Sequence, residues 1–234
     1  MAESRTVEGT VVAPPLERAR QRAGDGLAER SGQSASAAYL TVKRIGDVLL
    51  AAVAIILCAP LWLVCAIAIK LDSRGPILFR QVRPGHRGVP FHILKFRTMC
   101  EDAEERLGEV LDRNKEPDHS LIRVDEDPRV TRVGHLLRKW SIDETPQFIN
   151  VLRGEMSIVG PRPISRPIPD PRGYQRLAAK PGITGVWQTN GRKLTDCQHM
   201  LDLDMDYLNK RCLLLDAALI ARTFAAVLRA DGAE

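Results

Sequence analysis

The chain has 234 residues, 44% of them hydrophobic, which is enough for one domain with an apolar core. Its formal net charge of +5 favours anionic partners such as phosphates, nucleic acid or lipid headgroups, without choosing among them. The five cysteines are widely spaced and form no C-x-x-C pair, which excludes a disulfide framework and a zinc site of the usual spacing.

Residues 1–40 are predicted to be a disordered tail. They are rich in Ala, Ser, Gly, Arg and Glu, and their few large apolar residues follow no period. The segment lacks the apolar region of a secretory signal peptide, so we expect it to lie in the cytosol.

Residues 41–75 are predicted to form a membrane helix. No residue from Val48 to Ile69 is charged, and a straight helix over this stretch would be roughly 33 Å long, enough to cross a bilayer core. Pro60 lies near its middle, where it predicts a kink of about 20° or more.

Basic residues stand at both ends of this helix. Cations mark the cytoplasmic side of a membrane segment. Their presence at both ends favours a re-entrant helix that bends at Pro60 and leaves on the side it entered, but a kinked single span stays open. The flanking residues are Lys43, Arg44, Lys70 and Arg74.

The remaining residues, 76–234, predict one compact domain that is mostly helical with a small β-hairpin. Short apolar pieces between residues 76 and 99 alternate with turn signals at Pro84-Gly85 and Gly88, which is typical of a hairpin. Loops are expected in the polar stretch after residue 114 and in the five-proline stretch 160–173. Helices are predicted at 101–114, 133–139, 145–152 and 207–228.

The last of these helices, 207–228, is apolar on most faces. It fits either a core helix or an amphipathic helix lying in the membrane interface, and its low charge favours the interface.

Asp143 and Glu144 are the strongest candidates for chemistry. Ser141-x-x-Glu144 matches a capping box, the ordinary structural explanation, but Pro146 would then obstruct the helix at its fifth position. With Thr145 as N-cap, Pro146 takes the favourable first position, and both acids lie just outside the positive end of the helix. We expect carboxylates there to have a lowered pKa and to serve as a nucleophile or as ligands of a hard metal ion.

Basic residues close to this pair would offset the repulsion between the two carboxylates. Arginine and lysine side chains are also what phosphate chemistry requires. The pattern alone leaves a catalytic site and a solvated charge cluster both open. These residues are Arg132, Arg138, Lys139 and Arg153.

The chain resembles the bacterial sugar transferase family over residues 43–228. The motifs that carry the resemblance stand in order: KRIGD, the apolar run with its proline, GPILFRQVRPG, FHILKFRTM, DPRVTRVGHLLRKWSIDETPQFINVLRGEMSIVGPRP and KPGITGVWQTNGR. These are monotopic polyprenol-phosphate glycosyl-1-phosphate transferases, which begin the assembly of exopolysaccharides, O-antigens and other glycans. The resemblance implies a re-entrant membrane helix broken at Pro60, a cytosolic catalytic domain at 76–234 and interfacial amphipathic helices.

The implied reaction moves a hexose-1-phosphate from a UDP-sugar to undecaprenyl phosphate and releases UMP. In the family, the aspartate that matches Asp143 is the nucleophile and forms an aspartyl phospho-sugar. Glu144 would help to hold Mg²⁺ or would deprotonate the acceptor, and both acids are predicted metal ligands. The residues expected to bind phosphate or substrate are Lys95, Arg97, Arg138, Arg162, Arg192 and Asp206.

The resemblance also implies the surroundings of the enzyme. The expected partners are the UDP-sugar, undecaprenyl phosphate and membrane lipids, with a homodimer left open, and the expected place is the cytoplasmic face of the bacterial inner membrane. The alternative is a membrane-anchored nucleic-acid-binding or scaffold protein without catalysis. The sequence carries no helix-turn-helix, RNP or zinc signature, so no nucleic-acid partner is expected.

Overall fold

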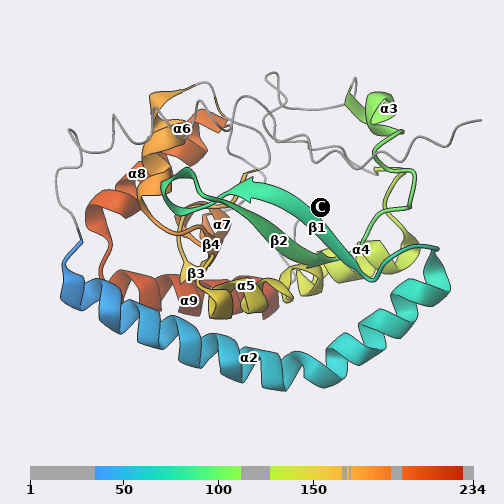
Figure 1. The fold of residues 1–234 in the computed structure, drawn as a ribbon, viewed down its shortest axis with the longest axis horizontal. Coiled ribbons are helices and arrows are strands. Elements are labelled where there is room, and N and C mark those ends of the chain that lie inside the picture. Colours follow the sequence, from blue (N-terminus) through green and yellow to red (C-terminus); the bar gives the residue numbers. More distant parts are fainter. Residues whose placement is uncertain (1–34, 112–126, 165–167, 169, 191–196, 229–234) are drawn as a thin grey trace, which may run out of the picture.

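The computed structural model describes residues 35–111, 127–164, 168, 170–190 and 197–228 (Figure 1). Most of the predicted tail therefore lies outside the described residues. Its last residues do not continue a tail, because they begin the first helix at Ala37.

The described residues are mostly helical, as predicted, with a small antiparallel hairpin. Three 3₁₀ turns, η1 (His86–Gly88), η2 (Ile142–Glu144) and η3 (Arg176–Ala178), connect the longer elements. In chain order these are α2 (Ala37–Asp72), β1 (Leu78–Pro84), β2 (Pro90–Phe96), α3 (Leu107–Leu111), α4 (Arg132–Lys139), α5 (Gln147–Arg153), β3 (Ser157–Val159), α6 (Pro171–Gln175), β4 (Gly182–Thr184), α7 (Val186–Thr189), α8 (Cys197–Lys210) and α9 (Leu213–Leu228).

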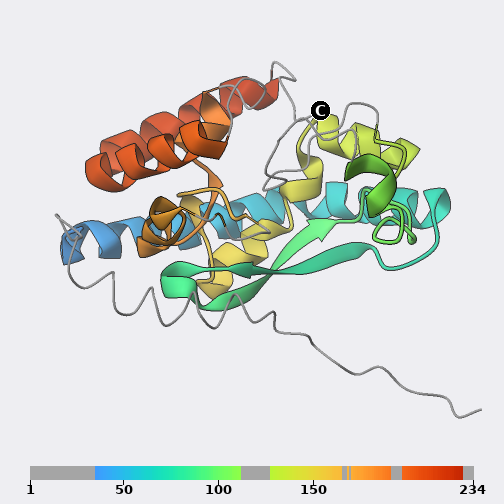
Figure 2. The same cartoon turned by 90° about the horizontal axis from the view of Figure 1, so that it is seen from above.

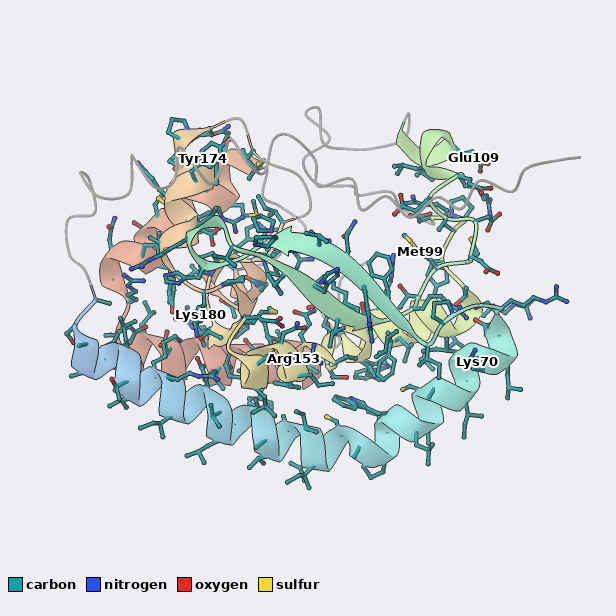
Figure 3. The ribbon with its side chains drawn as sticks, in the orientation of Figure 1. Lys70, Met99, Glu109, Arg153, Tyr174 and Lys180 are labelled. Atoms are coloured by element: carbon teal, nitrogen blue, oxygen red, sulfur yellow. The ribbon has the colours of Figure 1, made fainter. Side chains whose placement is uncertain are left out.

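Helix α2 is the predicted apolar helix, and it continues through Pro60 for 36 residues. Figure 1 shows it bowed, with its middle lowest and both ends rising on the side of the other elements. It is long and apolar enough to cross a membrane. Ile56 and Leu57, near the middle, are 71% and 73% exposed, and Figure 3 shows the side chains along the outer side of α2 pointing away from the rest of the chain.

The inner side of α2 is tied to the elements above it. Arg44 donates from Nη1 to the carbonyl of Val151 at 2.6 Å, at the end of α5, and Asp47 accepts the backbone N–H of Ile158 at 2.9 Å. Lys43 forms a 2.8 Å ion pair with Asp216 of α9. Lys43 and Arg44 thus form bonds within the protein. They are therefore weaker indicators of membrane topology than their place beside the apolar run suggested.

The hairpin of β1 and β2 has the predicted strands and turn, with Arg83 paired to Phe91 and Phe79 to Lys95. Asn150, fully buried on α5, holds its position: Oδ1 accepts the N–H of Leu94 at 3.0 Å, while Nδ2 donates to the carbonyl of His92 at 2.7 Å. Through these two hydrogen bonds, Asn150 fixes the position of β2 relative to α5, the helix that follows Asp143 and Glu144.

A second, parallel strand pair was not predicted. It joins β3 to β4, and the two backbones meet closely: a Cβ on Gly160 would lie 2.3 Å from the carbonyl oxygen of Lys180. Only glycine fits at position 160, and the chain continues from it into Pro161, Arg162 and Pro163. The core around the pair includes Phe91, Val151, Met156, Val159 and Leu219.

The predicted helix 207–228 was wrong as a single element. The chain leaves α8 after Lys210 and starts α9 at Leu213. Figures 1 and 2 place α9 beside the N-terminal half of α2, opposite the hairpin. Leu214 and Phe224 on α9 are 81% and 68% exposed, so one face of the helix is apolar and uncovered by the described residues, while Leu219 belongs to the core.

Candidate active site

The two acids lie in the 3₁₀ turn η2, between α4 and α5. Helix α4 ends at Lys139, and Ser141 then takes a left-handed conformation, with φ 54° and ψ 24°. This conformation costs a residue other than glycine roughly 1–2 kcal/mol, and it rules out the capping-box role of Ser141. Thr145 is not the N-cap of α5 either, since its hydroxyl donates to the carbonyl of Ile142 at 2.7 Å and the helix begins after Pro146.

Asp143 points into the protein and is only 8% exposed. The pKa of Asp143 is raised from 3.8 to about 6 overall. Burial is the largest cause and raises it, as does Glu144, whereas Lys95, Arg138 and Arg162 lower it. The lowered pKa predicted from the helix end is therefore wrong for Asp143. The turn lies before the first N–H groups of α5, and loss of water around the carboxylate outweighs the attraction of the cations.

Glu144 is the member of the pair that contacts cations directly. Lys95 of β2 donates to its Oε1 at 2.7 Å, and Arg162 approaches the same oxygen at 4.0 Å. Arg138 of α4 lies close enough for Asp143 and Glu144 to raise its pKa, although burial lowers that pKa overall. The structure thus brings three of the predicted cations, Lys95, Arg138 and Arg162, around the dyad of Asp143 and Glu144.

Arg162 is held from two sides. Its guanidinium lies over the ring of Trp187, 5.0 Å from the centroid, and its backbone carbonyl accepts a 2.7 Å hydrogen bond from Arg176. Arg176 is paired at 2.5 Å with Asp204 of α8, and both side chains are almost fully buried. Trp187 itself is buried and packs against apolar residues of α8.

Helix α2 reaches the site through Trp62. Its Nε1 donates to the Thr145 hydroxyl at 2.8 Å, directly after the dyad, and its ring meets Phe96 edge to face at 6.2 Å. Trp62 is half-buried, whereas its neighbours Leu61 and Leu63 are exposed. Its place two residues after Pro60 puts it on the inner side of the bowed helix, where it connects α2 to the turn η2.

Three predicted site residues lie apart from this cluster or outside the description. Arg97 is buried, and its Nη2 donates to the carbonyl and the hydroxyl of Ser73 at the end of α2, at 2.7 and 2.9 Å. Asp206 is exposed on α8 and pairs with Lys210 at 3.2 Å. Arg192 lies outside the described residues. Substrate-binding roles for all three stay predictions.

Two residues near the site were missed by the sequence analysis. Asn150 looked like an ordinary polar residue of a helix, and no pattern pointed to its bonds with β2. Arg83 of β1 contacts the carbonyl of Pro163 at 3.4 Å and is influenced by the charges of Arg162 and Glu144. The hairpin register places Arg83 on the same face as Lys95, but the turn signals in the sequence did not fix that register.

The donor set suits one particular kind of metal site. Among the described residues, no group of three or more His, Cys, Asp or Glu side chains is placed to hold a metal ion. Mg²⁺ needs fewer protein ligands, because it is usually held by one or two carboxylates together with substrate phosphates and water. The adjacent Asp143 and Glu144 fit that requirement, whereas zinc and calcium need larger sets of protein ligands.

Comparison with known proteins decides the family, because the family model described as bacterial sugar transferase matches residues 38–230. The chain belongs to this family. The family confirms the resemblance carried by the ordered motifs, and with it the prediction that the chain is an enzyme, a transferase.

Curated members of the family are similar over most of this chain. The exopolysaccharide production protein ExoY of Sinorhizobium fredii is 39% identical over 196 residues, covering 81% of this chain and 87% of the relative. The UDP-glucose:undecaprenyl-phosphate glucose-1-phosphate transferase of Caulobacter vibrioides is 42% identical over 203 residues, covering 82% and 71%. The undecaprenyl-phosphate galactose phosphotransferase of Salmonella typhimurium is 36% identical over 200 residues, covering 82% and 41%.

Proposed function

We propose that this chain transfers a hexose-1-phosphate from a UDP-sugar to undecaprenyl phosphate and releases UMP. The observation that carries the proposal is a buried aspartate beside a glutamate, with Lys95, Arg138 and Arg162 gathered around them. The three cations carry more charge than the two carboxylates can balance, and this excess positive charge suits the phosphates of a sugar diphosphate. Relatives named for this kind of transfer, with glucose, galactose and N-acetylgalactosamine, support the reaction class but not one sugar.

Asp143 is the nucleophile of the proposed mechanism. Its Oδ attacks the sugar-linked phosphorus of the donor, an Asp–O–P bond forms, and the bond to the bridging oxygen breaks as UMP leaves. A phosphate oxygen of the lipid then attacks the same phosphorus, the Asp–O–P bond breaks, and the lipid diphosphate sugar is formed. Burial supports this role, because a carboxylate stripped of water is a stronger nucleophile than a hydrated one.

Glu144 organises the other charges of the site. Its ion pair with Lys95 holds the lysine ammonium beside the dyad. We propose that Glu144 also holds Mg²⁺ and that Asp143 can supply a second carboxylate oxygen to the metal. The metal would supply positive charge that reduces the repulsion between the donor phosphates and the nucleophile. Arg138 and Arg162 would bind the oxygens that gain charge as the phosphorus is attacked.

The proposed setting is the cytoplasmic face of the bacterial inner membrane, with α2 re-entrant. The bow of α2, its exposed apolar middle and its two ends on one side support re-entry. The exposed apolar face of α9, next to α2, supports an additional contact with the interface. The acceptor phosphate lies at the membrane surface on a tail that cannot leave the bilayer, so a site held at that surface reaches it without extraction.

The reaction is tested with the full chain in detergent, a panel of UDP-sugars, undecaprenyl phosphate and Mg²⁺. We expect UMP release with at least one sugar, ping-pong kinetics, and a phospho-hexose adduct on Asp143 in mass spectra of the quenched enzyme. Asp143→Asn should remove both UMP release and adduct while the protein stays in the membrane fraction. Full activity of this variant, or lipid product without any adduct on the wild type, would refute the mechanism.

Topology is tested by labelling single cysteines, introduced at Ala38 and Arg74 after the native cysteines are replaced. Both positions are exposed and lie at opposite ends of α2. A re-entrant helix leaves both reactive toward a membrane-impermeant reagent on the same side of oriented vesicles. Labelling from opposite sides would establish a span.

A further inference from the structure

We propose that Arg83 binds the phosphate that leaves with the nucleoside, so that the donor diphosphate lies between Asp143 and the turn of the hairpin. This inference rests on the proposed function, and it assigns a substrate-binding role to a residue outside the predicted cluster. Its argument comes from the hairpin register, the contacts of the guanidinium and the charge of the site.

The hairpin places Arg83 and Lys95 on one face. Lys95 is the cross-strand partner of Phe79, and Arg83 lies four residues further along the same strand, so the two side chains point to the same side. The distance between their levels along the strand is roughly 13 Å. Lys95 reaches Glu144 at one end of this face, and Arg83 stands near the turn at the other.

Arg83 extends the cation cluster past Arg162. Its Nη1 makes a long, 3.4 Å contact with the carbonyl of Pro163, the residue after Arg162, and its Nη2 donates to Gln81 at 2.6 Å. Its Nε is buried and has no hydrogen-bond partner within the described residues. The guanidinium is thus oriented by two contacts and retains a donor for a ligand.

The local charge is unbalanced when the site is viewed from Arg83. Arg162 repels it and Glu144 attracts it, while burial lowers its pKa to about 10. Two partly buried arginines next to one carboxylate already paired with lysine keep an excess of positive charge. A diphosphate supplies the missing negative charge, and the fork of a guanidinium matches phosphate oxygens.

The position along the face decides which phosphate Arg83 takes. Asp143 must meet the sugar-linked phosphorus, and Lys95, Arg138 and Arg162 are the cations that act on Asp143. The charges that act on Arg83 are those of Arg162 and Glu144, so we place Arg83 beyond these two residues as seen from Asp143. On this placement, Arg83 takes the phosphate farther from the nucleophile, which is the one that departs as UMP.

The test compares Arg83→Gln with Arg80→Gln, a control on the same strand whose arginine is exposed. The KM for the donor and the inhibition constant of UMP should both rise roughly 10- to 100-fold in Arg83→Gln, because a charged hydrogen bond is lost. The KM for undecaprenyl phosphate should stay the same, and Arg80→Gln should change none of the three. An unchanged donor KM, an unchanged UMP constant or an equal rise in the lipid KM would overturn the assignment.

Two further measurements keep the result interpretable. Arg83→Lys retains the charge and can reach Pro163, so if Arg83→Gln unfolds, a several-fold weaker UMP constant in Arg83→Lys supports the proposal and an unchanged one rejects it. Calorimetric binding of UMP alone needs no turnover. A wild type that binds UMP but transfers no sugar would contradict the proposed function, whereas equal UMP affinity of the wild type and Arg83→Gln would contradict only the role of Arg83.

Discussion

Replacing Asp143 by asparagine should make the protein more stable while it removes activity. Burial raises the pKa of this carboxyl from 3.8 to about 6 even though Lys95 lowers it. The ionised form at neutral pH is therefore less favourable in the folded chain than in the unfolded chain. Asparagine keeps the shape of the side chain and carries no charge, so it escapes this cost.

The magnitude follows from the shift. A change of about two pKa units at roughly 1.4 kcal/mol each gives about 3 kcal/mol, and a range of roughly 2–3 kcal/mol allows for cations that lose a counter-charge. For a chain of this length, 1 kcal/mol moves the melting temperature by roughly 2–4 °C. We therefore expect Asp143→Asn to melt roughly 4–12 °C higher at pH 7.5.

The assay is thermal unfolding in detergent with EDTA, at several pH values. Below about pH 4 the carboxyl is protonated in both folded and unfolded chains, and the two proteins should melt alike. The advantage of the variant should grow between pH 4 and pH 6 and be complete above pH 6. Added Mg²⁺ should reduce it, since a bound cation stabilises only the wild-type carboxylate.

The control is Asp202→Asn, which removes a carboxylate that is 63% exposed on α8. A surface pair contributes about 0–1 kcal/mol, so this variant should melt near the wild type or slightly below it at every pH. If Asp143→Asn also melts at or below the wild type at pH 7.5, the cations around Asp143 outweigh its loss of water, and the reasoning from burial fails.

The other predictions concern activity and the supports of the site. Because Asp143 must be ionised to attack, kcat/KM for the donor should rise with pH to about 6 and then level off. Lys95→Met should lower kcat about 100-fold through loss of a charge that faces the phosphates, whereas Lys70→Met, at the far end of α2, should leave kcat unaltered. Trp62→Phe keeps the ring but loses the bond to the threonine after the dyad, worth about 1 kcal/mol, so UMP release should slow several-fold without loss of membrane association. Burial raises the pKa of Asp204 as well, but Asp204→Asn leaves the almost fully buried Arg176 charged without a carboxylate partner. This larger cost should destabilise the chain by about 3–5 kcal/mol in the same melting assay.

The parts of the fold that the sequence predicted are those set by local chemistry. The uncharged run from Val48 to Ile69 predicted α2, and Pro84 and Gly85 predicted the hairpin turn. Helix α4 begins within one residue of its predicted start. The strand pair of β3 and β4 was missed because three-residue strands are too short to show a period, and the break at residues 211 and 212 carries no glycine or proline.

The candidate site divides in the same way. Its acids and three of its cations could be found from motifs, because the proposed chemistry requires residues of these types. The pKa of Asp143 could not, since it depends on how much water the folded chain removes. The contact of Trp62 with Thr145 could not be predicted either, because composition does not reveal which residues lie on the inner side of a bowed helix.

Helix α2 bonds to the elements that carry the candidate site. Its N-terminal half binds the end of α5 through Arg44 and the middle of β3 through Asp47. Past Pro60 it contacts Thr145, the residue after the dyad, through Trp62, and at its end Asp72 accepts an N–H from the first turn of α4, that of Val133, at 3.0 Å. The helix thus meets the chain on both sides of Asp143. If α2 lies in the bilayer and Asp143 is the nucleophile, as proposed, a change in the bow of α2 would move Asp143 relative to the lipid phosphate. The hydrogen bond from Trp62 to Thr145 should therefore affect the rate of transfer.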